Sequence, residues 1–277
     1  MRIIPACVLQ DGKALSILSW NIAGIRAKIN DPSWLAFINQ FSIICLQETW
    51  DYEGDTNIDG FIHFSKLAIK GRMGRARGGL SILISTTIPC SIKQKEVVSG
   101  NCLAIELSIT KELNLLILNV YNPGHNEPGY PVSSSIRNIL GAPQSDPSYS
   151  LLDKGVILAG DLNIHLCKAY CPLSSSFSQM GLEDWLHFEH TTQGTLFNDL
   201  LIDLGLCLPQ NHGGPPLSTF IGRSCNTQID FFLVSFRDRH LFSDTQLSWT
   251  PWSDHNPIHT CFSYGFHCRD NVVPSLK

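Results

Sequence analysis

Hydrophobic positions along the chain fall into short runs that turn residues separate. The runs are too short for most helices and rich in β-branched residues, which favours buried strands. They lie at residues 15–20, 42–47, 80–85, 102–109, 113–121, 155–160, 230–235 and 257–262. This pattern predicts a protein built mainly from buried β-sheet.

Helical spacing of apolar residues occurs in two segments. Residues 31–41 start with Asp31 as a predicted N-cap, followed by proline, and residues 195–206 contain Gly205 as a predicted helix stop. The apolar residues on the two predicted helix faces are Trp34, Phe37, Ile38 and Phe41, and Leu196, Leu200, Leu201 and Leu204.

Many strands, few helices and no charge-rich linker indicate one domain. We expect an α/β fold in which two packed, mainly antiparallel sheets are flanked by helices. Segments 124–135 and 141–150 are rich in turn residues, so we expect surface loops there. We assign residues 1–14 to an N-terminal extension, residues 15–265 to the domain and residues 266–277 to a C-terminal tail.

Composition narrows the functional classes. Of 277 residues, 43% are hydrophobic and 16% are charged, which excludes a disordered chain. The net charge of −4 excludes binding of long nucleic acid by bulk charge, so any polyanion must bind locally. No apolar run reaches the length of a membrane span or a signal peptide, so we expect no membrane association and no secretion. Ten scattered cysteines favour a reducing compartment, nucleus or cytoplasm.

Polar residues stand where the predicted strands begin or end. Each of them alone is typical of a turn residue beside a strand. Together they combine carboxylates, carboxamides, a phenol and an imidazole, which is the set needed to hydrolyse a phosphodiester with a hard metal ion. The set comprises Asn21, Glu48, Tyr121, Asn122, Asp161, Asn163, Asp230, Asp254 and His255.

The segments around these residues resemble, in order, motifs of the endonuclease/exonuclease/phosphatase superfamily. The motifs are "SWNIAG", "LQETW", "VYNP", "GDLN", "QIDFFLVS" and "SDHNPI", within about residues 15–262. The resemblance implies a four-layered α/β sandwich that uses a divalent metal to cleave phosphoester bonds. Within the superfamily, "LSTFIGRSCNTQIDFFLVS" makes the chain most similar to endonuclease domains of non-LTR retrotransposons, with abasic-site endonucleases as the nearest relatives.

The resemblance also implies a metal site. Glu48 corresponds to the main ligand of Mg²⁺, for which Mn²⁺ could substitute. Asn21 would steady that carboxylate, and Asp254 would be a second carboxylate on the metal side.

The same resemblance implies catalytic roles. His255 corresponds to the histidine that activates the attacking water, and Asp230 to the acid that orients this imidazole. Asp161 and Asn163 would lie at the scissile phosphate, where they orient the nucleophile or the leaving oxygen, with Tyr121 nearby.

Two regions are candidate DNA contacts. The resemblance implies that Thr219 and Ser218 bind the DNA backbone. The segment 66–77 carries Arg72, Arg75 and Arg77 without an acidic residue, and either contacts phosphates beside the active site or forms a solvated loop.

These features predict a Mg²⁺-dependent DNA endonuclease of retrotransposon type that nicks one strand and leaves a 3′ hydroxyl. The alternatives are an abasic-site repair endonuclease, another phosphoesterase of the superfamily, and a catalytically silent relative that binds nucleic acid or protein. We expect a monomeric domain with DNA as its partner, either stand-alone or part of a larger protein that contains a reverse transcriptase.

Overall fold

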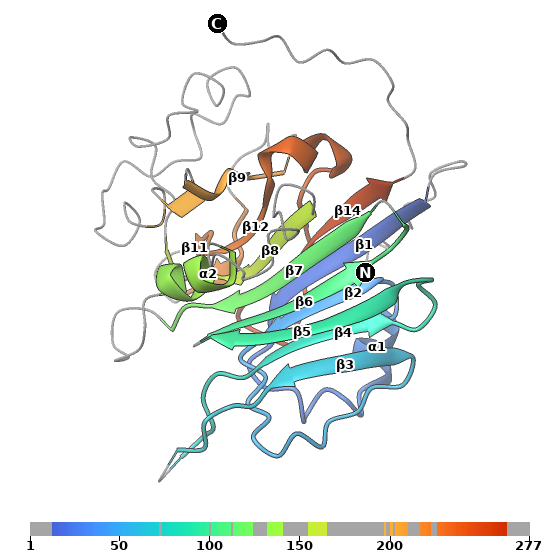
Figure 1. The fold of residues 1–277 in the computed structure, drawn as a ribbon. Helices are drawn as coiled ribbons and strands as arrows, with labels where there is room; N and C mark the ends of the chain where they lie inside the picture. Colours follow the sequence, from blue (N-terminus) through green and yellow to red (C-terminus); the bar gives the residue numbers. More distant parts are fainter. Residues whose placement is uncertain are drawn as a thin grey trace, which may run out of the picture.

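In a computed structural model, the chain forms two six-stranded sheets packed face to face, with helices on the outer faces (Figure 1). The residues that the structure describes are 13–71, 74–99, 101–111, 113–123, 132–140, 155–164, 197, 200–201, 203–209, 217–222 and 226–264. The order of layers is therefore helix, sheet, sheet, helix, and the expected α/β sandwich is confirmed.

The first sheet has the strand order β13-β14-β1-β2-β4-β3. Only β1 and β2 are parallel neighbours, and the other pairs are antiparallel. The strands are β1 (Lys13–Asn21), β2 (Ile43–Gln47), β3 (Phe61–Lys66), β4 (Leu80–Ser85), β13 (Gln246–Leu247) and β14 (Ile258–Tyr264).

The second sheet has the order β5-β6-β7-β8-β12-β9, with β7 and β8 as its parallel pair. A two-stranded ladder of β10 and β11 lies apart from both sheets in the pairing. The strands are β5 (Ser91–Ser99), β6 (Cys102–Ser108), β7 (Asn114–Tyr121), β8 (Gly155–Asp161), β9 (Leu206–Cys207), β10 (Phe220–Ile221), β11 (Asn226–Thr227) and β12 (Asp230–Ser235).

Central strands are apolar on both faces because each face is covered. On β1, Leu15 and Ile17 face the core between the sheets, whereas Leu18 and Trp20 belong to the cluster under α1. Successive strand residues point to opposite faces, so a strand buried on both sides needs a continuous apolar run. The runs identified in the sequence have this origin.

The helix α1 (Pro32–Ile38) begins as predicted, since Asp31 caps it by accepting from the amides of Ser33 and Trp34 at 2.8 and 3.4 Å. A second helix, α2 (Val132–Leu140), packs Ile136 and its apolar neighbours on the outer face of the second sheet. The expectation of a surface loop over all of 124–135 was therefore wrong for residues 132–135.

Of the predicted helix at 195–206, the described residues 197, 200, 201, 203 and 204 are helical, whereas Leu206 belongs to β9. Gly205 follows the helical residues at φ 60°, a left-handed conformation that glycine adopts at low cost. Leu196 lies outside the described residues. No helix in the described part of the chain has the length and apolar character needed to span a membrane.

Candidate active site

The topology brings strand ends from both sheets to one end of the sandwich. In the parallel pairs, Asn21 of β1 lies opposite Gln47 of β2, and Tyr121 of β7 lies opposite Asp161 of β8. Asp230 opens β12 directly opposite Asp161. The Asn21 side-chain amide donates to Asp161 Oδ2 at 2.9 Å, so a hydrogen bond joins the two sheets at this end.

These strand ends surround a cleft of about 980 Å³. Of the residues predicted from the sequence, those that line it are Asn21, Glu48, Arg75, Arg77, Tyr121, Asp254 and His255. Asp161 and Asp230 are only 1% exposed and lie beside His255. Asn21 and His255, which are 234 positions apart in the sequence, therefore line the same cleft.

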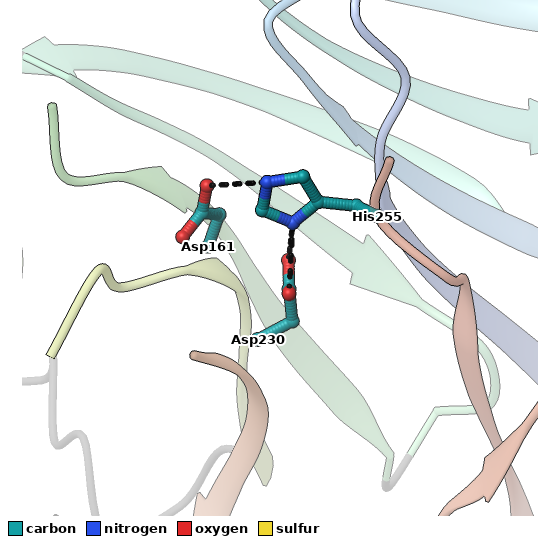
Figure 2. Close-up of side chains that lie close together, drawn as sticks. All are labelled: Asp161, Asp230 and His255. Atoms are coloured by element: carbon teal, nitrogen blue, oxygen red, sulfur yellow. Dashed lines mark hydrogen bonds and ion pairs between the residues drawn. The ribbon is translucent and has the colours of Figure 1, made fainter. Parts of the chain in front are cut away.

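His255 lies between two buried carboxylates (Figure 2). Its Nδ1 is 3.0 Å from Asp230 Oδ2, a distance at which the ring N–H donates to the carboxylate. Its Nε2 is 3.8 Å from Asp161 Oδ2, on the other side of the ring. Asp230 therefore fixes the tautomer of the imidazole and leaves Nε2 directed toward Asp161.

Burial and the neighbouring charges together set the pKa values of His255 and Asp161. Burial disfavours the charged imidazole, but the charge and hydrogen bond of Asp230, together with Asp161 and Asp254, outweigh it and raise the pKa of His255 to about 9. Burial and the neighbouring Asp230 charge raise the pKa of Asp161. Two buried carboxylates around one imidazole form a site where an added cation is electrostatically favourable.

The loop after β8 presents Asn163. This residue has φ 47°, and its backbone amide donates to Asp161 Oδ1 at 3.0 Å. Its side-chain amide donates to the carbonyl of Asn122 at 2.7 Å, while Asn122 donates to the carbonyl of Leu162 at 2.7 Å. The reciprocal pair locks the ends of β7 and β8 together. The sequence places Asn122 at a strand end, but its role in the loop was not predicted.

Glu48 follows β2 in a left-handed conformation, with φ 52°. Its Oε2 accepts from the indole N–H of Trp50 and from the amide of Gly78, the latter at 3.3 Å. Among the described residues, the tightest group of possible metal ligands is Asp161, Asp230 and His255, whose ligand atoms lie within 4.8 Å of one another. This group differs from the predicted ligand set of Glu48, Asn21 and Asp254.

The oxygen-rich donors around the cleft fit a hard divalent cation. The carboxylates of Glu48 and Asp254 line the cleft, and that of Asp161 lies in the buried group beside His255. Asn21 engages the site differently from the prediction, because its amide nitrogen holds Asp161 while its Oδ1 accepts from the amide of Ala23 at 3.2 Å.

Thr219, a predicted DNA contact, is hydrogen-bonded to its own chain. Its side chain is buried, and its hydroxyl accepts from the amides of Ile229 and Asp230 at 3.0 and 3.2 Å. Ser218 is partly exposed, and its carbonyl accepts from the Asn256 side chain at 3.0 Å. The sequence shows that a hydroxyl stands near the site. It does not show that this hydroxyl accepts hydrogen bonds from backbone amides of the same chain.

The basic segment reaches the cleft. The described residues 67–71 and 74–79, here called the β3–β4 arm, project away from the sheets (Figure 1), and Ile69 pairs with Arg77 across it. Arg75 and Arg77 are exposed and line the same cleft as His255. Arg72 lies outside the described residues.

Further residues hold the site and were not predicted. The Trp20 indole donates to the carbonyl of His255 at 2.9 Å, and the Ser253 hydroxyl donates to the carbonyl of Asn21 at 2.8 Å. Both residues stand inside the motifs that contain the site residues, which is the only signal the sequence gives for them. Lys28 is buried and donates to the carbonyl of Gly24 at 2.7 Å.

A two-sheet sandwich with an Asp-paired imidazole and further carboxylates at one open cleft defines the class of phosphoester hydrolases. The model of the endonuclease/exonuclease/phosphatase family matches residues 18–255, most of the chain. The chain therefore belongs to this family, whose members are generally metal-dependent hydrolases of nucleic acids or other phosphoesters.

Solved structures share the fold at low sequence identity. An abasic-site (AP) endonuclease of Leishmania major has a TM-score of 0.64 and 18% identity over 91% of this chain and 89% of its own. The endonuclease domain of TRAS1, a telomere-specific non-LTR retrotransposon, has a TM-score of 0.59 and 15% identity over 90% and 98%. A 3′–5′ exonuclease of Neisseria meningitidis has a TM-score of 0.58 and 17% identity over 90% and 100%. No curated protein sequence matches the chain.

Proposed function

We propose that this protein is a divalent-metal-dependent DNA endonuclease that nicks one strand and leaves a 3′ hydroxyl end, as retrotransposon endonucleases do. The observation that carries the proposal is the Asp230–His255 pair beside Asp161, at a cleft that Glu48 and the basic β3–β4 arm also line. One surface therefore combines a general base, acidic residues that can bind a metal ion, and arginines that can bind phosphates.

The residues divide the chemistry among them. His255 accepts the proton of the attacking water through Nε2, while Asp230 holds Nδ1 and stabilises the positive ring that results. Asp161 orients the nucleophile or the leaving oxygen. Asn163 donates to a phosphate oxygen in this proposal by exchanging its side-chain contact with the Asn122 carbonyl for the phosphate. Tyr121, at the cleft, is the phenol nearest the scissile phosphate in this proposal.

The metal ion belongs with Glu48 and Asp254, and Asn21 steadies the buried carboxylate beside it. When bound, Mg²⁺ or Mn²⁺ supplies charge stabilisation for the phosphoryl oxygens. Without a cation, the raised pKa of about 9 keeps His255 protonated near neutral pH. The imidazole would act as the base once a cation held by Glu48 and Asp254 disfavours that protonation.

The basic arm favours a polymeric polyanion as the substrate. The chain has a net charge of −4, yet exposed Arg75 and Arg77 lie together along the cleft. A DNA backbone presents phosphates on either side of the reacting one, where these arginines can bind them. This arrangement supports a substrate with several phosphates over a monophosphate, and the substrate panel below separates DNA from an inositol phosphate.

One substrate panel tests the proposal. The purified protein is incubated with supercoiled plasmid, an abasic-site duplex or an inositol phosphate, each with Mg²⁺ or with EDTA. Metal-dependent nicking of the plain plasmid, with ends that a polymerase extends directly, is the expected result. Cleavage confined to the abasic duplex would assign the protein to repair, release of phosphate alone to the phosphatases, and no turnover of any substrate would contradict catalysis altogether.

A further inference from the structure

Trp50 lies at the metal side of the cleft, but the proposed reaction assigns it no role. It lines the cleft with Glu48. A Cβ added at Gly24 would lie 2.5 Å from the ring, so only glycine lets the backbone approach it this closely. The Arg75 guanidinium lies 3.6 Å from the centre of the same ring. Two separate parts of the chain therefore contact the indole.

Backbone strain is concentrated around this residue. Among the described residues other than glycine, positive φ angles occur at Ala23, Glu48, Trp50 and Asn163. Three of these four residues line the cleft, and the fourth donates to Asp161. A positive φ costs about 1–3 kcal/mol for a bulky residue and persists where the surrounding structure requires it. Trp50, at φ 53°, belongs to the same strained group as Glu48.

The polar end of the ring is directed at the carboxylate. The Trp50 indole N–H donates to Glu48 Oε2, and the amide of Gly78, at the base of the β3–β4 arm, donates to the same oxygen at 3.3 Å. Gly78 in turn accepts from the backbone amide of Trp50 at 3.0 Å. Among the described residues, none donates to the other oxygen, Oε1, so the two donors fix the carboxylate while one oxygen stays available at the cleft.

We propose that Trp50 is a positioning residue that holds the Glu48 carboxylate for a divalent cation, and that Arg75 braces it from the arm. The inference rests on the proposed function, because it assumes that Glu48 binds the metal. Groups that orient a ligand by a hydrogen bond typically change metal affinity by about 10–100-fold when they are removed.

The test compares two tryptophan-to-phenylalanine variants that each lose one indole–carboxylate hydrogen bond. In Trp50→Phe the ring that Arg75 stacks on remains, but the donor to Glu48 is gone. In the control, Trp252→Phe, the lost bond is the 2.8 Å contact with Asp31, the cap of α1. Calorimetric titration of the metal-free proteins with Mn²⁺ should show about tenfold weaker binding for Trp50→Phe and binding within twofold of wild type for the control.

Two further measurements separate positioning from a general structural defect. The Mn²⁺ concentration for half-maximal nicking should rise about tenfold in Trp50→Phe, and the rate should recover at saturating Mn²⁺. The second measurement is an NMR titration of the wild-type protein with Mg²⁺, which is diamagnetic, unlike Mn²⁺. The indole N–H resonance of Trp50 should shift as Mg²⁺ is added, whereas the resonance of Trp252 should not. This measurement does not depend on the folding of a variant.

The outcomes distinguish the inference from the proposed function. A wild-type protein that binds the cation and nicks plasmid, combined with unchanged Mn²⁺ affinity in Trp50→Phe and no shift of its resonance, overturns the positioning role alone. A wild-type protein that binds neither Mn²⁺ nor Mg²⁺ overturns the proposed function and the inference together.

Discussion

Thr219→Val separates the role that the structure gives this residue from the DNA contact expected from its motif. Valine keeps the shape of the side chain but removes the hydroxyl that accepts from the amides of Ile229 and Asp230. Because Thr219 is 0% exposed, water cannot replace the lost acceptor. An unsatisfied buried amide costs about 1–3 kcal/mol, so the two together should lower the free energy of unfolding by about 2–4 kcal/mol.

Thermal and urea denaturation measure this cost. At about 2–4 °C per kcal/mol for a chain of this size, the Tm should fall by roughly 4–16 °C. Thr219→Ser keeps the hydroxyl and is the matched control, with a small loss from the missing methyl group. DNA affinity of folded Thr219→Val, measured by fluorescence anisotropy well below its Tm, should equal that of wild type. Wild-type stability together with weakened DNA binding would refute the buried role and restore the surface contact.

Three other perturbations test the electrostatics, the packing and the basic arm. The raised pKa of His255 stabilises the metal-free fold below pH 6.5, and this stabilisation of about 3 kcal/mol is lost as pH rises from 6.5 to about 9. Denaturation in EDTA should show this decline in wild type and a smaller one in His255→Gln, in which only Asp161, whose pKa is also raised, still contributes. Gly24→Ala should weaken Mn²⁺ binding because the new methyl group displaces the Trp50 indole. The control Gly60→Ala is also at positive φ but has open space around it, so it should lower stability without changing Mn²⁺ affinity. Equal Mn²⁺ affinities of the two variants would contradict this packing. Replacing Arg75 and Arg77 by glutamine should weaken DNA binding and lower the slope of its salt dependence by about 2, and an unchanged slope would argue for a solvated loop.

The sequence identified the buried strands well because each is an apolar run covered on both faces. It missed β3 and β5, which are the outer strands of their sheets. Ile62 of β3 is 41% exposed, and "SIKQKEVVS" of β5 alternates with lysines, so neither forms an apolar run. An outer strand needs only one apolar face, and periodicity in a short segment of that kind is a weak signal.

The strand-end residues were predictable as a set, whereas their hydrogen bonds were not. Asp161 and Asp230 meet because β8 and β12 are neighbours, a pairing over nearly 70 positions that local sequence does not specify. His255 joins them from the segment before β14, which belongs to the other sheet. The local sequence also does not specify the direction in which a side chain points. The Thr219 hydroxyl accepts from backbone amides of its own chain, and the Trp50 indole donates to Glu48. Neither hydrogen bond could be predicted from the sequence.

The comparison of two buried histidines tests the central claim, that His255 and its carboxylates form the hydrolytic site. His255→Gln and His259→Gln each remove an imidazole near the same chain end, but His259 packs against Phe41, and burial lowers its pKa to about 4. Single-turnover nicking of supercoiled plasmid at saturating Mg²⁺ should fall by about 10²–10⁴-fold in His255→Gln and by no more than a few-fold in folded His259→Gln. Equal rates for the two variants would contradict the assignment of His255 as the base.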